Sequence, residues 1–159
     1  MLRQRAVPTA SATELANDIE PFRALNDAPL GMTGHLLFTA WDSENPATLS
    51  SKVIGDIIRS EIGFGGLLLT DDIDMEALTG SVPERSKRAL AAGCDVVLNC
   101  WAKMDDMVGI AERCGTLTNE AKARLARVHE AMGEPAEGPP PEELLAKRDA
   151  LLAIARERA

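Results

Sequence analysis

The sequence predicts an α/β domain built around a parallel sheet. Three short runs carry this prediction, and the second and third of them are apolar without alternation until their carboxyl ends, which is typical of strands buried on both faces. These runs are Leu30–Leu37, Gly66–Thr70 and Asp95–Cys100, and amphipathic helical segments lie between them. Strands that alternate with helices and recur about every 30 residues are typical of right-handed βαβ units. The carboxyl ends of all three strands are therefore expected at one edge of the sheet.

Capping residues predict where the first helices begin. The segment from Ser11 to Glu14 has the form of a capping box, in which serine and glutamate each satisfy an otherwise unpaired backbone N–H. That helix is expected to stop or bend near Pro21. Phe22 and Leu25 are then expected to anchor a second short helical turn.

Two longer helices are expected between the strands. The first opens at Ser50 or Ser51 and ends at Gly63, which supplies a left-handed cap. Its apolar residues fall on one face and are Val53, Ile54, Ile57, Ile58 and Ile62. The second helix starts in the segment Ser81–Glu84, which combines a capping box with a proline in the first turn, and it ends at Gly93.

The last third of the chain predicts helices and a linker. Helices are expected at Met104–Arg113 and Asn119–Met132, and they complete a first domain of residues 1–132. Residues 133–141 are rich in proline and poor in apolar side chains, so they are expected to form an extended linker. Residues 142–159 are expected to form an amphipathic tail helix that docks on its own domain. The apolar stripe of this helix is Leu144, Leu145, Leu151, Leu152 and Ala155.

Charge and composition argue against several classes of partner. The 17 basic and 25 acidic residues give a net charge of −8, which disfavours nucleic acid and anionic membrane surfaces. No apolar stretch has the length of a signal-peptide core or a membrane span, so we expect a cytoplasmic protein. The three cysteines lack a Cys-x-x-Cys spacing, so we expect reduced thiols and neither a zinc site nor a disulfide framework. Aromatic residues make up only 3%, which leaves Trp41 and Trp101 as the large side chains available to stack on a sugar.

Polar residues gather where the predicted strands end. Asp71 and Asp72 follow the second strand, and His35 and the run Asn99–Trp101 lie near the ends of the other two. In parallel α/β sheets this edge faces the active-site crevice. Position alone favours plainer interpretations, because one aspartate of such a pair more often caps a helix and a lone histidine is more often structural. A Mg²⁺ site of a receiver or phosphotransfer domain is a weaker alternative, since no lysine follows at the end of the next strand.

The residues around the aspartate pair form a longer motif. From Gly63 to Met75 they read Gly-Phe-Gly-Gly-Leu-Leu-Leu-Thr-Asp-Asp-Ile-Asp-Met. This run resembles the nucleophile segment of family 3 glycoside hydrolases, and within that family the β-N-acetylhexosaminidase branch. Further segments are similar to family motifs in the same order and at similar spacing, and they are Pro21–Leu25, Met32–His35, Pro46–Ser50 and Ala91–Asp95. Together the segments cover about residues 7–115.

The resemblance implies a fold, a reaction and roles for individual residues. The fold is α/β, a partial (β/α)8 TIM-type barrel with parallel strands plus C-terminal helices, because 159 residues are too few for a complete barrel. Residues 1–132 then correspond to the C-terminal half of the catalytic barrel. The implied reaction is retaining hydrolysis of terminal β-N-acetylglucosamine from peptidoglycan fragments, with no cofactor and no metal. Asp71 is implied as the nucleophile, with Asp72 orienting its loop and His35 and Met75 binding the substrate.

The sequence departs from the family pattern at the second catalytic group. In the family a histidine in an Asp-Ser-His triplet is the acid/base, whereas the matching positions here are Leu2, Arg3 and Gln4, and the upstream substrate-contacting segment is absent. We therefore expect a truncated or split copy whose isolated chain is inactive or weak. Its expected partners are a small carbohydrate substrate, an N-acetylglucosaminide, and either a complementary N-terminal half or a second copy bound through exposed sheet edges. The alternative is a non-catalytic remnant that serves as a binding or assembly module.

Overall fold

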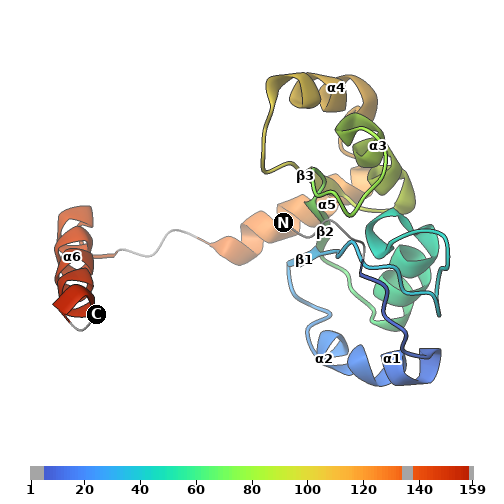
Figure 1. Cartoon of the computed structure of the whole chain (residues 1–159), viewed down its shortest axis with the longest axis horizontal. Helices are drawn as coiled ribbons and strands as arrows, with labels where there is room; N and C mark the ends of the chain where they lie inside the picture. The colour runs from blue at the N-terminus through green and yellow to red at the C-terminus, as the bar shows by residue number, and fades with distance from the viewer. Residues whose placement is uncertain (1–5, 134–137, 158–159) are drawn as a thin grey trace.

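The molecule is centred on a small parallel sheet (Figure 1). The computed structural model describes residues 6–133 and 138–157, with the side chains of the tail as far as Ile154. The sheet has the order β1-β2-β3, and both neighbouring pairs run parallel. The strands are β1 (Leu30–Met32), β2 (Leu67–Asp72) and β3 (Val96–Leu98). The predicted α/β class with parallel strands is therefore confirmed.

Helices precede, separate and follow the strands. Before β1 lie α1 (Ala12–Asp18) and α2 (Glu20–Arg23). Between β1 and β2 lie η1 (Ala47–Leu49) and η2 (Val53–Glu61), and α3 (Val82–Ala92) connects β2 to β3. The chain continues with α4 (Met104–Cys114), α5 (Asn119–Met132) and α6 (Pro141–Glu157). Helix α4 packs on α3, and α5 packs against β2.

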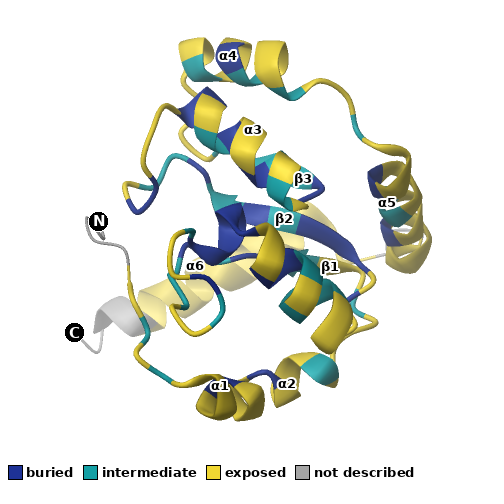
Figure 2. Cartoon of the chain, turned by 90° about the vertical axis from the view of Figure 1, so that its right-hand side faces the viewer, coloured by how far each residue is buried: buried dark blue, intermediate teal, exposed yellow. Residues whose placement is uncertain are grey.

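The hydrophobic core lies around β2, which is the most deeply buried strand (Figure 2). Side chains from η2, β2, the loop after β2 and α3 meet there. The buried members of the core are Leu49, Ile54, Phe64, Leu68, Ile73, Leu78, Val82, Ala89 and Cys94. Burial of the Cys94 thiol raises its pKa to about 12, so this cysteine stays protonated and acts as an apolar core residue.

The predicted helix ends are confirmed at several points. Ser11 and Ser81 both form capping boxes, with the backbone N–H of each serine donating to a glutamate three residues later, at 2.8 Å and 2.9 Å. Gly63 and Gly93 end η2 and α3 with φ angles of 78° and 117°, a region that L-residues with a side chain rarely adopt. Local sequence therefore determines where these helices stop and turn back towards the sheet.

The winding of η2 differs from the predicted α-helix. Its turns are wider, and the N–H of Ile62 donates to the carbonyl of Ile57 at 2.8 Å, five residues earlier. The Ser60 hydroxyl likewise donates to the Gly55 carbonyl at 2.8 Å. The apolar pattern predicts a helix and the burial of Val53 and Ile54 correctly, but it carries no signal for this wider turn.

The first strand is shorter than the predicted Leu30–Leu37. After Met32 the chain leaves the sheet because its backbone finds other partners. The N–H of Leu37 donates to the Ala6 carbonyl at 3.0 Å, and the N–H of Ala47 donates to the Leu36 carbonyl at 2.8 Å. The apolar residues of this run therefore belong to a loop that packs on η1, and they do not extend β1.

Three apolar predictions in the outer parts of the chain are wrong in detail. Phe22 and Leu25 do not anchor α2 to the body, because both side chains are exposed. The tail helix α6 does not dock on its own domain either, since every described side chain in it is exposed (Figures 1 and 2). The third prediction concerns β3, whose side chains are half-buried rather than buried on both faces. In each case the described residues leave these side chains partly or largely exposed.

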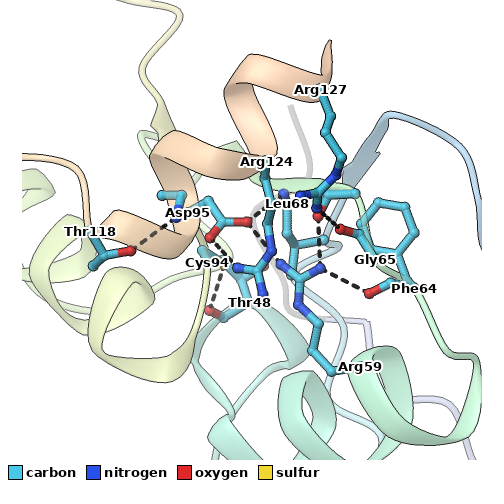
Figure 3. Close-up of polar contacts among 12 residues, drawn as sticks. Thr48, Arg59, Phe64, Gly65, Leu68, Cys94, Asp95, Thr118, Arg124 and Arg127 are labelled. Atoms are coloured by element: carbon cyan, nitrogen blue, oxygen red, sulfur yellow. Dashed lines mark hydrogen bonds and ion pairs between the residues drawn. The ribbon is translucent and has the colours of Figure 1, made fainter. Parts of the chain in front are cut away.

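A buried carboxylate at the start of β3 joins distant segments of the chain (Figure 3). The side chain of Asp95 is 4% exposed and accepts from Arg59 of η2 at 2.8 Å and from Arg124 of α5 at 2.6 Å. It also accepts from the backbone N–H of Leu68 in β2 at 2.9 Å. One carboxylate therefore fixes two helices to two strands.

The two arginine-bearing helices make further contacts with the segment that leads into β2. Arg59 donates to the carbonyls of Phe64 and Gly66 at 3.0 and 2.7 Å, and Arg127 donates to the carbonyl of Gly65 at 2.9 Å. Burial, followed by the nearby positive charge of Arg124, lowers the pKa of Arg59 from its ordinary value, and the Asp95 carboxylate counteracts this. The amino edge of the sheet is thus held by charge-assisted hydrogen bonds.

We predict that Asp95→Asn lowers the free energy of unfolding by about 2–4 kcal/mol, because it leaves two partly buried guanidinium groups without their counter-charge. Glu20→Gln is the matched control, since its ion pair with Arg23 at 2.9 Å is largely exposed. That change should cost less than about 1 kcal/mol. Urea denaturation followed by circular dichroism measures both. Equal losses in the two variants would contradict the role assigned to Asp95.

Candidate active site

Strand β2 carries an extra residue where its carboxylates begin. Leu69 pairs with Val96 and Asp72 pairs with Leu98, so β2 advances by three residues while β3 advances by two. The Thr70 hydroxyl fills the irregularity by accepting from the N–H of Leu98 at 2.9 Å. Bulges of this kind re-aim side chains and are frequent beside active sites. The sequence placed Asp71 and Asp72 just past the strand, whereas both belong to its last, bulged part.

Backbone N–H groups surround the two carboxylates. Asp71 accepts from the N–H of Asp72 at 2.8 Å. Asp72 accepts from the N–H of Asp74 at 3.2 Å and from the N–H of Cys100, just past β3, at 3.1 Å. Loss of solvation, followed by the charges of Asp72 and Asp71, raises the pKa of the Cys100 thiol. The ends of β2 and β3 therefore meet at one negatively charged edge, as predicted.

His35 lies beneath this edge and supports it. The residue is only 5% exposed, and both ring nitrogens have partners within the chain. Nε2 is 2.9 Å from the carbonyl oxygen of Asp72, which can only accept, so Nε2 carries a proton. Nδ1 is 2.8 Å from the Thr48 hydroxyl, and that hydroxyl is also 2.8 Å from the hydroxyl of Thr33. The predicted contact of His35 with substrate stays a prediction, because the ring already uses both nitrogens to hold the strand end.

Arg85 of α3 holds the loop that follows the carboxylates. Its Nη1 donates to the carbonyls of Ile73 and Met75, both at 3.2 Å. Met75 is half-buried in this loop, and its predicted role in the wall of a sugar pocket stays a prediction. Arg85 has no local signal in the sequence, because an arginine on a helix is ordinarily a solvated charge. Only the return of α3 onto the sheet brings it to the loop.

Several buried polar atoms at this edge lack a hydrogen-bond partner in the described part of the chain. They are Oδ2 of Asp74, Nε of Arg85 and Nδ2 of Asn99. Unsatisfied buried polar groups are rare in folded proteins and call for an explanation such as a ligand, water or strain. Ala102, which follows this edge, has a φ of 48°, and its N–H donates to Asn99 Oδ1 at 3.3 Å. Backbone strain and unmet polar groups thus coincide beside the carboxylates.

The loop between His35 and η2 borders the same edge and is organised by Asp42. The carboxylate accepts from the Ser50 hydroxyl at 2.7 Å and from the N–H groups of Glu44 and Asn45 at 2.9 and 3.1 Å. Burial acts to raise the pKa of Asp42, but these hydrogen bonds outweigh it and lower the pKa to about 2. The sequence marked this segment as a polar loop without identifying the carboxylate that orders it.

Other predicted site features are placed as follows. Trp101 is 59% exposed beyond β3 and lies under the Lys103 ammonium at 5.9 Å from its ring centre, while Trp41 packs on Phe38 with ring centres 4.9 Å apart. Among the described residues no group of three or more His, Cys, Asp or Glu side chains is arranged to hold a metal ion, so the magnesium alternative gains no support. The positions matched to the acid/base triplet, Leu2–Gln4, lie outside the described residues.

Two hollows lie away from the carboxylates. One of about 580 Å³ lies between α5 and the loops around Ala28 and Gly65, and one of about 420 Å³ follows α1, α2 and β1. Neither of these two hollows is lined by Asp71. No helix in the described part of the chain is both long enough and apolar enough to cross a bilayer.

Fold and site together define an α/β domain with carboxylates at the carboxyl ends of parallel strands, where such folds carry out chemistry. The family model described as the glycosyl hydrolase family 3 N terminal domain matches residues 4–131. The chain therefore belongs to glycosyl hydrolase family 3.

Known proteins agree with this assignment. A β-hexosaminidase of Nitrosomonas eutropha is 39% identical over 102 residues, covering 61% of this chain and 29% of the relative. A β-hexosaminidase of Methylobacillus flagellatus is 33% identical over 120 residues, covering 72% of this chain and 34% of the relative. The chain thus spans about a third of the length of these relatives.

Solved structures show the same fold. A family 3 β-N-acetylglucosaminidase from Paenibacillus superposes with a TM-score of 0.73 at 24% identity, covering 86% of this chain and 29% of that one. NagZ from Neisseria gonorrhoeae superposes with a TM-score of 0.63 at 26% identity, covering 79% of this chain and 37% of that one.

We predict that the stability of the chain falls between pH about 4 and about 2, because the folded state keeps Asp42 ionised to a lower pH than the unfolded chain does. Stability from this group is fully present above the unfolded pKa and is lost as pH falls through the folded one. Ser50→Ala removes a donor and moves the folded pKa towards the unfolded one, so the loss should be smaller and should be complete at a higher pH. Ser60→Ala, whose hydroxyl binds a backbone carbonyl instead, is the control. Urea titrations at a series of pH values measure this, and identical pH profiles for the two variants would be inconsistent with the role of Asp42.

Proposed function

We propose that this chain carries the nucleophile part of a retaining β-N-acetylhexosaminidase, with Asp71 as the nucleophile. The main observation behind this proposal is the position of Asp71 on the bulged end of β2, inside a segment that matches the family motif. The relatives named β-hexosaminidase support the substrate class, a terminal β-N-acetylglucosaminide. Trimming of peptidoglycan fragments in the cytoplasm is the biological setting that we propose for this reaction.

We propose further that residues 1–132 form the C-terminal half of a (β/α)8 barrel. Strands β1 and β3 each pair only with β2 among the described residues, so both outer edges of the sheet are open. In a closed barrel such edges pair with neighbouring strands. This chain spans about a third of the length of its relatives. That share is consistent with a part of a barrel that a further segment completes. Residues 133–141, partly outside the described residues, then serve as the linker to a separate tail helix, residues 142–159.

The proposed chemistry needs two groups. A carboxylate attacks the anomeric carbon and forms a glycosyl-enzyme, while a second group protonates the leaving oxygen and then activates water. Asp71 supplies the first group, and its carboxylate needs no cofactor. The described residues around it supply support instead, since His35 holds the backbone of Asp72 and Arg85 holds the loop that follows the bulge. The second group belongs to the segment that completes the barrel.

A binding or assembly module is the second candidate function. The open sheet edges favour it, because β1 and β3 each pair with β2 alone among the described residues. The two candidates differ in one measurable property. A catalytic half acquires turnover when the complementary half is supplied, whereas a remnant binds a partner without gaining activity.

We predict that Asp71→Asn lowers turnover by at least about 10⁴-fold in a chain completed with the N-terminal half of the Nitrosomonas eutropha relative, because the nucleophile is lost. The matched control Asp72→Asn should lose about 10-fold, since Asp72 only orients the loop. A fluorinated N-acetylglucosaminide should trap a covalent adduct on Asp71, identified by peptide mass spectrometry. An adduct on any other residue would overturn the assignment.

We also predict that the 159-residue chain alone shows little hydrolysis of a nitrophenyl N-acetylglucosaminide. Loss of acid/base help typically costs about 10²- to 10⁴-fold, and loss of substrate-orienting groups adds to this. Mixing with a separately produced N-terminal half should restore activity. Robust turnover by the chain alone would show that a group within it, such as His35, replaces the missing acid. No activity after mixing would favour the binding module.

A further inference from the structure

The tail helix α6 has an apolar face with no partner. Its four leucines, Leu144, Leu145, Leu151 and Leu152, are between 47% and 59% exposed. The helix stands away from the rest of the molecule (Figure 1) and lies outside the residues matched by the family model. Isolated helices of about this length are marginal in water, so α6 needs a surface to pack on.

The apolar face of α6 has one charge at its centre. At 100° per residue the four leucines occupy one side of the helix, and Arg148 falls between them. Among the described residues its guanidinium binds the neighbouring Asp149, at 2.7 and 2.8 Å, and both side chains are exposed. A surface that receives this face must therefore be apolar with a single negative group.

The hollow along α1, α2 and β1 has that chemistry. It holds about 420 Å³ and is mainly apolar. Four of its lining side chains, Phe22, Leu25, Leu30 and Met32, are between 48% and 62% exposed. Asp18 at the end of α1 is the charged residue in its lining, and its carboxylate has no hydrogen-bond or ion-pair partner among the described residues. We name this hollow the α1–β1 groove.

We propose that α6 of one copy of this chain docks in the α1–β1 groove of a second copy, with Arg148 facing Asp18. The leucines would cover the exposed groove residues, as an amphipathic helix does in an apolar groove. Each copy gives a helix and receives one, so the contact repeats with two-fold symmetry and closes as a dimer. The exchange requires no part of the proposed glycosidase function.

The segment before α6 favours a second copy over the same chain. Pro139 and Pro140 come directly before the helix and Pro141 is its first residue, so the approach to α6 is extended and stiff. In the structure α6 stands away from its own body (Figure 1), which leaves its own groove empty for a partner. A helix of 17 residues is about 25 Å long, which is sufficient to follow a groove formed by two short helices and a strand.

Light scattering coupled to size exclusion tests the exchange with the full chain. The expected mass is twice the 17.0 kDa of one chain. Leu151→Asp should weaken the dimer by about 100-fold or more, because it places a charge in the apolar contact. Ala146→Asp introduces the same charge on the opposite side of the helix and should leave the dimer intact. A chain that stays monomeric at every concentration, or equal effects of both variants, would overturn the proposal.

A charge exchange tests the register of the contact. Arg148→Glu and Asp18→Lys should each weaken the dimer by about tenfold or more, and the two changes combined should restore it. Circular dichroism establishes that each variant keeps its fold. Weakening by both single changes with no recovery in the combined variant would overturn the pairing of these two residues.

Crosslinking distinguishes a second copy from the same chain. Asp18→Cys in one chain and Arg148→Cys in another, both with Cys100→Ser, should form a disulfide-linked pair under mild oxidation. When both cysteines are placed in one chain, the expected products are also linked dimers. A closed monomer from that double variant, with no linked pair from the mixture, would show that α6 docks on its own chain, and the proposal would be rejected.

Discussion

The fold depends on one buried carboxylate at the amino edge of the sheet. Asp95 accepts from Arg59, Arg124 and the backbone of β2, so segments that are up to 65 residues apart in sequence are fixed at one point. A carboxylate with this burial is stable only because its partners are charged and well aligned. Within the described residues the sheet has three strands and two open edges, so hydrogen bonds between strands stabilise it less than they stabilise a larger sheet. The arginine contacts replace part of that missing constraint.

The opposite edge is built in a different way. The carboxylates of Asp71 and Asp72 accept from backbone N–H groups and make no ion pair within the described part of the chain. His35 and Arg85 contact backbone carbonyls there. The charged groups that stabilise the fold and the carboxylates that we assign to chemistry therefore occupy opposite ends of the same strands. This separation lets the candidate site remain strained and partly unsatisfied without weakening the core.

The sequence predicted the parts of this structure that local chemistry controls. Capping boxes and glycines with positive φ positioned the helices, and apolar runs identified the three strands. It could not predict the bulge in β2, because the extra residue is defined only by its register against β3. Arg85 and the Thr48 contact of His35 were missed for the same reason, since both connect segments that become neighbours only in the folded chain. The exposed face of α6 looks like a core helix in sequence, because amphipathicity does not specify which surface covers it.

The position of the positive charge near the carboxyl edge supports the proposal that Asp71 is the nucleophile. A carboxylate in a tight ion pair is a weaker nucleophile, because the cation stabilises the negative charge that would otherwise attack the substrate. Arg85 lies close enough to contact the Asp71 loop, yet its Nη1 donates to the carbonyls of Ile73 and Met75 instead of to a carboxylate. Asp71 accepts from the N–H of Asp72, a contact that orients the carboxylate without neutralising it. An oriented carboxylate on a strand end, without an ion pair among the described residues, is what the proposed role of Asp71 as nucleophile requires.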